Sequence, residues 1–349
     1  MGVVRRLARS VHWLFADDPF ERANRRPTLE HLDDYRDWLM AKGRTAKQAR
    51  EVHSRCRKMI GLCEFESLDR INAQTLEMEV AETVRGQWDC SLKTCNDYLK
   101  SMQQFCRWLA KPKIQRLPGN PLSDIQKYNA ATDVRHPRRP LSSDEFARVW
   151  AVTQARPPYV TRRRCPKTQI SGVDRAIYYL VKEQTGIRNL EARQLTPESF
   201  ELEGQRPCVR VPACYSKHRR EDRIPLSPAC CLLLRRWLAG KPAGAALWPL
   251  DDKPYRMWKA DLEAAGIAYV DAQGRFADLY SLRHRYGTEV GRRAPSMKAA
   301  QSMMRHSDPR LTARYQHVTL ADEQVILRSL PVPGPPPGSD LFGGMQQAG

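Results

Sequence analysis

The feature that most constrains the fold is an interruption in the helical spacing of apolar residues. This spacing is regular from residue 28 to 110, stops between residues 111 and 140, and resumes at residue 142. LPGNP (117–121) breaks the chain, and RHPRRPL (135–141) is a basic connector stiffened by prolines. An interruption of this kind within 349 residues predicts two domains and a linker, in agreement with about 150 residues per domain.

The first domain is predicted to be wholly helical. Leu29, Leu32, Tyr35 and Leu39 mark one helix, closed by Gly43. Further stripes of apolar residues predict helices over 46–63, near 74–84 and over 92–109, and we expect all four to pack into a core. The opposite face of the second helix is basic, and it is either a solvated surface or a phosphate-binding face. Its cations are Lys47, Arg50, Arg55, Arg57 and Lys58.

The second domain is predicted to be mainly α with a small β-hairpin. Ser142 and Glu145 form a capping box that opens its first helix. Helices are expected over 174–184, 228–239, 255–265, 281–292, 296–305 and 320–329, and hairpin strands over 209–213 and 223–226. The predicted organisation is an extension (1–27), a DNA-binding domain (28–124), a basic linker (125–140), a catalytic domain (141–330) and a disordered proline- and glycine-rich tail (331–349).

The charge of the chain favours a nucleic-acid partner. It has 58 Lys and Arg against 39 Asp and Glu, a net charge of +19, divided as +8 up to residue 140 and +11 beyond it. Residues 107–139 hold eight basic and two acidic residues, so we expect Arg135, Arg138 and Arg139 to follow a phosphate backbone. No apolar run approaches ~18 residues, and the N-terminus lacks the apolar core of a signal peptide. We expect a cytoplasmic, nucleoid-associated protein with no membrane partner.

Ten cysteines suggest a metal site, but their spacing argues against one. There is no C-x-x-C pair, and the nearest group is Cys208, Cys214 and His218 on the hairpin. Several cysteines lie on apolar stripes, where a free thiol packs as a small hydrophobic group. We therefore expect reduced, buried cysteines and no metal.

Four segments of the second domain carry side chains suited to chemistry on DNA. They are TGIRNLE (185–191), YSKHRREDRIPL (215–226), DLYSLRHRYG (278–287) and MMRHSDPRLTARYQHV (303–318). Their order and spacing resemble the tyrosine recombinase (phage integrase) family, over about residues 28–330. The resemblance implies an integrase fold, in which a four-helix, SAM-like core-binding domain and a mainly α catalytic domain form a C-shaped clamp around duplex DNA.

The resemblance also implies roles for individual residues. Arg188 and Arg283 match the two catalytic arginines, with Glu191 as the acidic companion of the first. Lys217 matches the catalytic lysine, His306 the His/Trp position and Tyr315 the nucleophile. Tyr280 departs from the pattern because histidine is commonest at its position, and we expect it to hydrogen bond rather than act as a base. His284 is expected on the other side of its helix, packed in the core.

These residue types form a self-consistent set for breaking a phosphodiester. Two guanidiniums can hold the non-bridging oxygens and stabilise the charge that develops on attack, so the mechanism requires neither a metal nor a cofactor. Lowering the pKa of a phenol from near 10 to about 7 requires ~4 kcal/mol of phenolate stabilisation. Nearby arginines and His306 are expected to supply a large part of it. A mobile lysine suits protonation of the departing 5′-oxygen. A phosphotyrosyl ester conserves the bond energy, so religation needs no ATP.

The sequence therefore predicts a site-specific DNA recombinase that works through a 3′-phosphotyrosyl intermediate. We expect a monomer in solution that becomes a homo-tetramer on double-stranded DNA, docked through the short apolar helix at 320–330. Two alternatives stay open. One is a nicking-closing enzyme of the type IB topoisomerase kind, and the other is a DNA-binding regulator without catalytic activity.

Overall fold

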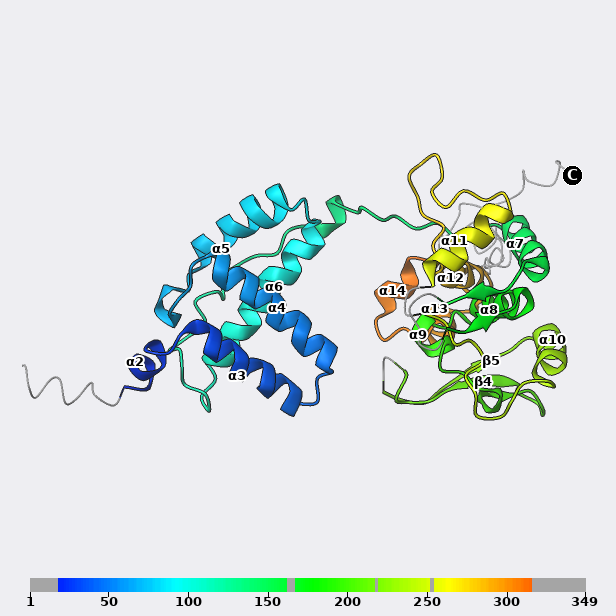
Figure 1. Cartoon of the computed structure of the whole chain (residues 1–349), viewed down its shortest axis with the longest axis horizontal. Coiled ribbons are helices and arrows are strands. Elements are labelled where there is room, and N and C mark those ends of the chain that lie inside the picture. Colours follow the sequence, from blue (N-terminus) through cyan, green and yellow to red (C-terminus); the bar gives the residue numbers. More distant parts are fainter. Residues whose placement is uncertain (1–17, 162–166, 217–218, 252–253, 316–349) are drawn as a thin grey trace, which may run out of the picture. The chain divides into compact units, whose positions relative to one another are not determined.

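The computed structural model describes residues 18–161, 167–216, 219–251 and 254–315. The chain divides into two compact units, Met1–Arg135 and His136–Gly349 (Figure 1). The boundary falls inside the segment that the sequence marks as a linker. None of the helices in the described ranges is both long and apolar enough to cross a membrane.

In its described residues, from 18 to 135, the first unit contains helices and no strand. They are α2 (Pro19–Asn24), α3 (Thr28–Ala41), α4 (Ala46–Leu62), η1 (Leu68–Arg70), α5 (Ala73–Glu79), η2 (Val80–Gln87), α6 (Leu92–Leu109) and η3 (Ala130–Thr132). Side chains of Thr45, Asn72 and Ser91 accept backbone hydrogen bonds at the starts of α4, α5 and α6. The four predicted helices are therefore present, and the third continues beyond α5 as the π-helix η2.

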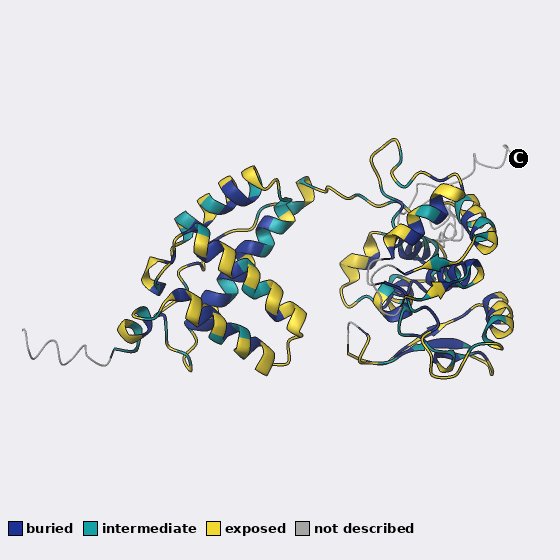
Figure 2. Cartoon of the chain, in the orientation of Figure 1, coloured by how far each residue is buried: buried dark blue, intermediate teal, exposed yellow. Residues whose placement is uncertain are grey.

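The core of this unit follows the apolar stripes. Leu32, Tyr35, Cys56 and Leu99 are buried, whereas Leu29 is 40% exposed and does not join them. Figure 2 shows the buried faces of α3, α4 and α6 alternating with exposed ones, as expected for amphipathic helices. All cysteines in the described ranges are free thiols.

The second unit combines helices with two small antiparallel sheets. Its helices are α7 (Ser143–Ala155), α8 (Gly172–Thr185), α9 (Asn189–Ala192), η4 (Pro197–Ser199), α10 (Pro228–Leu238), α11 (Tyr255–Ala264), α12 (Ser281–Arg293), α13 (Met297–Met304) and α14 (Pro309–Ala313). The strands are β1 (Tyr159–Val160) with β2 (Gln169–Ile170), and β3 (Phe200–Glu201), β4 (Cys208–Val211) and β5 (Asp222–Pro225) in the order β3-β4-β5. The predicted hairpin is β4-β5, with Val209 opposite Ile224.

Helix α8 lies at the centre of this unit, against α7 on one side and α12 on another. A Cβ at Gly172 would overlap backbone carbonyls of α7, so glycine permits this close approach. The core includes Tyr178, Tyr179 and Trp258, all inaccessible to solvent. The capping box of Ser142 and Glu145 at the start of α7 is confirmed. The predicted helix at 320–329 and the tail at 331–349 lie outside the described residues.

Candidate active site

Arg188 is positioned by a sharp turn at the end of α8. Gly186 adopts a left-handed backbone conformation (φ 59°) that ends the helix, and a Cβ there would overlap the ring of Tyr286. Two residues later, Arg188 becomes the N-cap of α9. Its guanidinium donates a hydrogen bond from Nη1 to Glu191 Oε1 at 2.8 Å, and its side chain is 22% exposed. Arg188 thus keeps further N–H donors for an outside anion.

Glu191 links Arg188 to a second, buried arginine that sequence reasoning missed. Glu191 Oε2 accepts from the Arg188 backbone amide at 3.0 Å and from Arg305 Nη2 at 2.9 Å. Burial acts to raise the pKa of Glu191, but the Arg305 charge and the bonds from Arg188 outweigh it and hold the pKa below its usual range. The expected companion of Arg188 is therefore a carboxylate shared by two arginines.

Arg305 also reaches the hairpin. Its Nη1 donates to Asp222 Oδ2 at 3.1 Å, and the same oxygen accepts from Ser216 Oγ at 2.9 Å. Ser216 directly precedes Lys217, which lies outside the described residues together with His218. Arg305 has φ 53°, a left-handed conformation that is costly for a residue other than glycine. The two buried ion pairs offset that cost and connect the Arg188 loop to the hairpin.

Arg283 is placed differently from expectation. The side chain is 1% exposed, and its Nη1 and Nη2 donate to the backbone carbonyls of Gly186 and Met304, the latter at 2.7 Å. Burial and the nearby charge of Arg188 lower the pKa of this guanidinium. Two of its five N–H donors are thus used to join the segment before Arg188 to the segment before His306.

Tyr315 lies against α12 next to an unexpected histidine. Its hydroxyl is 3.2 Å from His284 Nδ1, and the two ring centroids are 5.7 Å apart. The expectation that His284 packs in the core on the far side of its helix is therefore wrong. The ring of Tyr280, one helical turn earlier, meets the His284 ring edge-on at 5.3 Å. These three side chains form one aromatic group beside Arg283.

Two glycines of α12 make room for Tyr315. A Cβ at Gly287 would lie 2.9 Å from the Tyr315 ring, and a Cβ at Gly291 would overlap the Tyr315 backbone. The segment therefore approaches the helix more closely than any side chain at these positions would allow. Burial raises the pKa of Tyr315, and this effect exceeds the opposing influence of Arg283 and other cations. The arginines thus act on the phenol pKa in the expected direction, but burial outweighs them.

His306 lies between α13 and α14, on the other flank of Tyr315. Its Nδ1 is 3.0 Å from Thr312 Oγ1, and its ring is nearly parallel to that of Tyr315, with centroids 6.4 Å apart. The structure therefore brings together Arg188, Glu191, Tyr280, Arg283, His306 and Tyr315 on four neighbouring segments of one unit.

Lys182 is a second residue that the sequence did not reveal. It lies on α8 with 1% exposure, and its Nζ donates to the Ile187 carbonyl at 3.0 Å. Burial, reinforced by the charge of Arg283, lowers the pKa of this amine to about 7. The available signal was a lysine placed one helical turn after Tyr178 and Tyr179.

The cations expected to contact DNA have a variety of partners. On α4, Lys47 and Arg50 are exposed, Arg55 lies 3.8 Å from Asp97, and the Lys58 ammonium lies 5.2 Å from the Trp88 ring centroid. In the linker, Arg135 pairs with Asp133 at 3.0 Å, Arg138 with Asp278 at 2.6 Å and Arg139 with Glu145 at 2.8 Å. Each of the three linker arginines is thus paired with a carboxylate.

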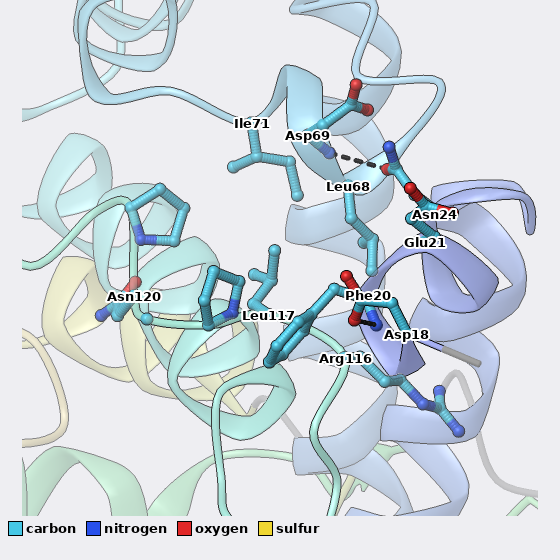
Figure 3. Close-up of a pocket in the computed structure, with 13 residues that line it drawn as sticks. Asp18, Phe20, Glu21, Asn24, Leu68, Asp69, Ile71, Arg116, Leu117 and Asn120 are labelled. Carbon is cyan, nitrogen blue, oxygen red and sulfur yellow. Dashed lines mark hydrogen bonds between the residues drawn. The ribbon is translucent and has the colours of Figure 1, made fainter. Parts of the chain in front are cut away.

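The described residues also line cavities that do not include Tyr315. One of about 500 Å³ lies in the first unit and is lined by Phe20, Leu68 and Leu117 together with acidic Asp18 and Glu21 (Figure 3). It shares no residue with the group around Tyr315. Within the described ranges, no cluster of His, Cys, Asp and Glu has the arrangement of a metal site.

Comparison with known proteins agrees with this geometry. Residues 164–321 match the profile of the phage integrase family, which supports the resemblance found in the sequence. A protein of Escherichia coli described as "Probable site-specific recombinase in afa region" is 31% identical over 157 residues. That match covers 41% of this chain and 62% of the recombinase, so the chain spans less than two thirds of that relative.

Solved structures share the fold at low sequence identity. An integrase of the Tn1549 transposon, in complex with transposon right end DNA, has a TM-score of 0.63 and 14% identity, covering 86% of this chain and 98% of that one. A lambda integrase dimer bound to a COC' core site has a TM-score of 0.60 and 15% identity, covering 82% and 94%. The integrase fold predicted from the sequence is therefore confirmed.

Proposed function

We propose that this protein is a site-specific recombinase that cleaves and rejoins DNA through a 3′-phosphotyrosyl intermediate. The observation that carries the proposal is the position of Tyr315, packed on α12 beside Arg283 and within one compact group with Arg188 and His306. The match of residues 164–321 to the phage integrase family supports the same function.

In the proposed reaction, the Tyr315 oxygen bonds to phosphorus and the bond from phosphorus to the 5′-oxygen breaks. Arg188, whose guanidinium is partly exposed, binds the non-bridging oxygens. Arg283 adds a buried positive charge and fixes the two loops that carry Arg188 and His306. Lys217 delivers a proton to the departing 5′-oxygen, and His306 hydrogen bonds to the phosphate. Glu191 holds Arg188 in position. Tyr280, whose ring packs against His284, forms a hydrogen bond at the site rather than acting as a base.

The proposed substrate is double-stranded DNA carrying specific recombination sites. Exposed cations of α4, including Lys47 and Arg50, and the linker arginines would contact its phosphates, the latter after exchanging their carboxylate partners. Among the proteins that share the fold, the Tn1549 integrase is in complex with transposon right end DNA and lambda integrase is bound to a COC' core site. Acting on DNA would place the protein at the nucleoid.

A nicked suicide duplex tests the activity directly. The intact chain should form a covalent complex that resists denaturant, whereas Tyr315→Phe should bind the same DNA and form none. An adduct that persists in Tyr315→Phe would contradict the assignment. A salt-sensitive complex without any adduct would point to the DNA-binding regulator, and cleavage without exchange between paired sites to the topoisomerase-like enzyme.

We further propose that a monomer in solution assembles into a homo-tetramer on DNA through residues 320–330, which lie outside the described residues. Truncation after Leu330 should leave recombination intact. Truncation after Leu320 should abolish pairing of two sites and spare binding to one. Recombination at the full rate by the shorter chain would show that this segment does not mediate assembly.

A further inference from the structure

Among the described residues, His284 forms a hydrogen bond with the hydroxyl of the proposed nucleophile, and the mechanism above gives it no task. Its Nδ1 lies 3.2 Å from the Tyr315 hydroxyl, within the distance that a proton transfer requires. Gly287 and Gly291, on the same face of α12, hold the Tyr315 segment against the helix. The contact is therefore part of a fitted interface between α12 and the segment that follows α14.

The protonation states of the two partners suit a transfer from phenol to imidazole. Burial lowers the pKa of His284, and the cations Arg138, Arg283 and Arg314 act in the same direction against an opposing influence of Asp278. His284 is consequently neutral near pH 7 and can accept a proton at Nδ1. Burial raises the pKa of Tyr315, so the phenol still carries its proton. A nucleophile in this state needs a base.

Position 280, where the resemblance leads us to expect a histidine, has no imidazole that could act as this base. Position 280 is a tyrosine, and its ring packs edge-on against His284 while Arg138 lies over its face at 5.3 Å. Tyr280 and His284 are separated by one helical turn and so lie on the same side of α12. An imidazole is thus present one turn further along, facing the nucleophile.

We propose that His284 is the general base that removes the phenolic proton of Tyr315, a role that rests on the proposed recombinase function. The O–H bond of Tyr315 breaks and its proton moves to Nδ1 of His284. The phenolate oxygen forms the bond to phosphorus, and the 5′-oxygen leaves with a proton from Lys217. In religation the 5′-hydroxyl gives its proton back to Lys217 as its oxygen bonds to phosphorus, the bond from phosphorus to Tyr315 breaks, and the imidazolium of His284 returns its proton to the departing phenolate.

The test compares His284→Gln with the wild-type chain in single-turnover cleavage of a suicide duplex. Glutamine keeps a polar side chain near the hydroxyl but cannot take up the proton. Cleavage should slow by roughly 10²–10⁴-fold, the range for loss of a general base, with unchanged affinity for the duplex. Thr288→Ala is the matched control one turn further along α12, where the hydroxyl donates to the His284 backbone carbonyl, and it should leave the cleavage rate unchanged.

Replacing Tyr315 with a fluorinated tyrosine separates a chemical role from a structural one. A more acidic phenol needs less help from a base, so fluorination should restore at least part of the lost rate in His284→Gln and change the wild-type rate little. Slow cleavage that fluorination does not restore would show that His284 only supports the structure and would overturn the proposal.

Two further outcomes are decisive. Rescue by fluorination in His306→Gln, and not in His284→Gln, would assign the base to His306 and overturn the proposal. Wild-type cleavage rates in His284→Gln would overturn this proposal alone, whereas a wild-type chain that forms no adduct would overturn the proposed function as well.

Discussion

Replacing Lys182 with methionine should flatten the dependence of stability on pH. The pKa of Lys182 is about 7 in the folded chain against an ordinary value of 10.5, because burial disfavours the charged amine. Between these values the unfolded chain carries a proton that the folded chain lacks, so unfolding takes up a proton and stability rises with pH. Below about pH 7 both states are protonated and the contribution to the slope disappears.

The size of this effect follows from the two pKa values. Each pH unit within the window contributes up to ~1.4 kcal/mol, and the amine is half titrated at pH 7. Between pH 7 and 9 the wild-type chain should therefore gain about 2 kcal/mol of unfolding free energy relative to Lys182→Met. Other groups titrate alike in both proteins, so their contributions cancel in the difference.

Urea unfolding read by pulse proteolysis measures this difference on the full-length chain, because fragments of the two units can be followed separately. The curves for wild type and Lys182→Met should diverge from pH 7 to 9. Parallel curves would show that Lys182 stays charged in the fold and would refute the argument from burial.

Three further outcomes are expected. Arg305→Gly relieves ~1 kcal/mol of left-handed backbone strain, but it leaves two buried carboxylates without their shared cation, which costs ~3–5 kcal/mol. The same urea assay should therefore show that the free energy of unfolding falls by about 2–4 kcal/mol. Equal stability would refute the role of this ion-pair network. Single-turnover cleavage should proceed in EDTA without ATP, since guanidiniums supply the positive charge, and a loss restored by Mg²⁺ would indicate a nuclease mechanism. Lys217→Ala should cleave normal DNA slowly, but its cleavage rate should recover on a substrate with a 5′-bridging sulfur, because that leaving group needs little protonation. A recovery of the rate only in Arg219→Ala or Arg220→Ala would assign the proton donor to that position of the hairpin instead.

Local patterns predicted the helices because apolar spacing and caps act within a few residues. The boundaries of α4 and α6 and the capping box of α7 all follow from such signals. The elements that the sequence did not reveal are short, such as α9, α14 and the strands of the β1-β2 sheet. Segments of two to five residues do not repeat a pattern often enough to be recognised.

The residues missed at the site depend on contacts between distant parts of the chain. Arg305 and Glu191 are 114 positions apart, and no local pattern joins them. The sequence misplaces His284 because adjacent residues of a helix point in different directions, and a single face of α12 directed at the site would include Arg283 and exclude its neighbour. The helix instead uses two faces, and Gly287 and Gly291 in register with His284 were a signal that another segment packs there.

The most direct test of the central claim is to identify the residue that bonds to DNA. After trapping on a suicide duplex, protease digestion and mass spectrometry of the nucleotide-linked peptide should place the phosphodiester on Tyr315, with the 3′-phosphate of the cleaved strand attached. A linkage to Tyr280 or to any other residue, or a linkage through a 5′-phosphate, would contradict the account.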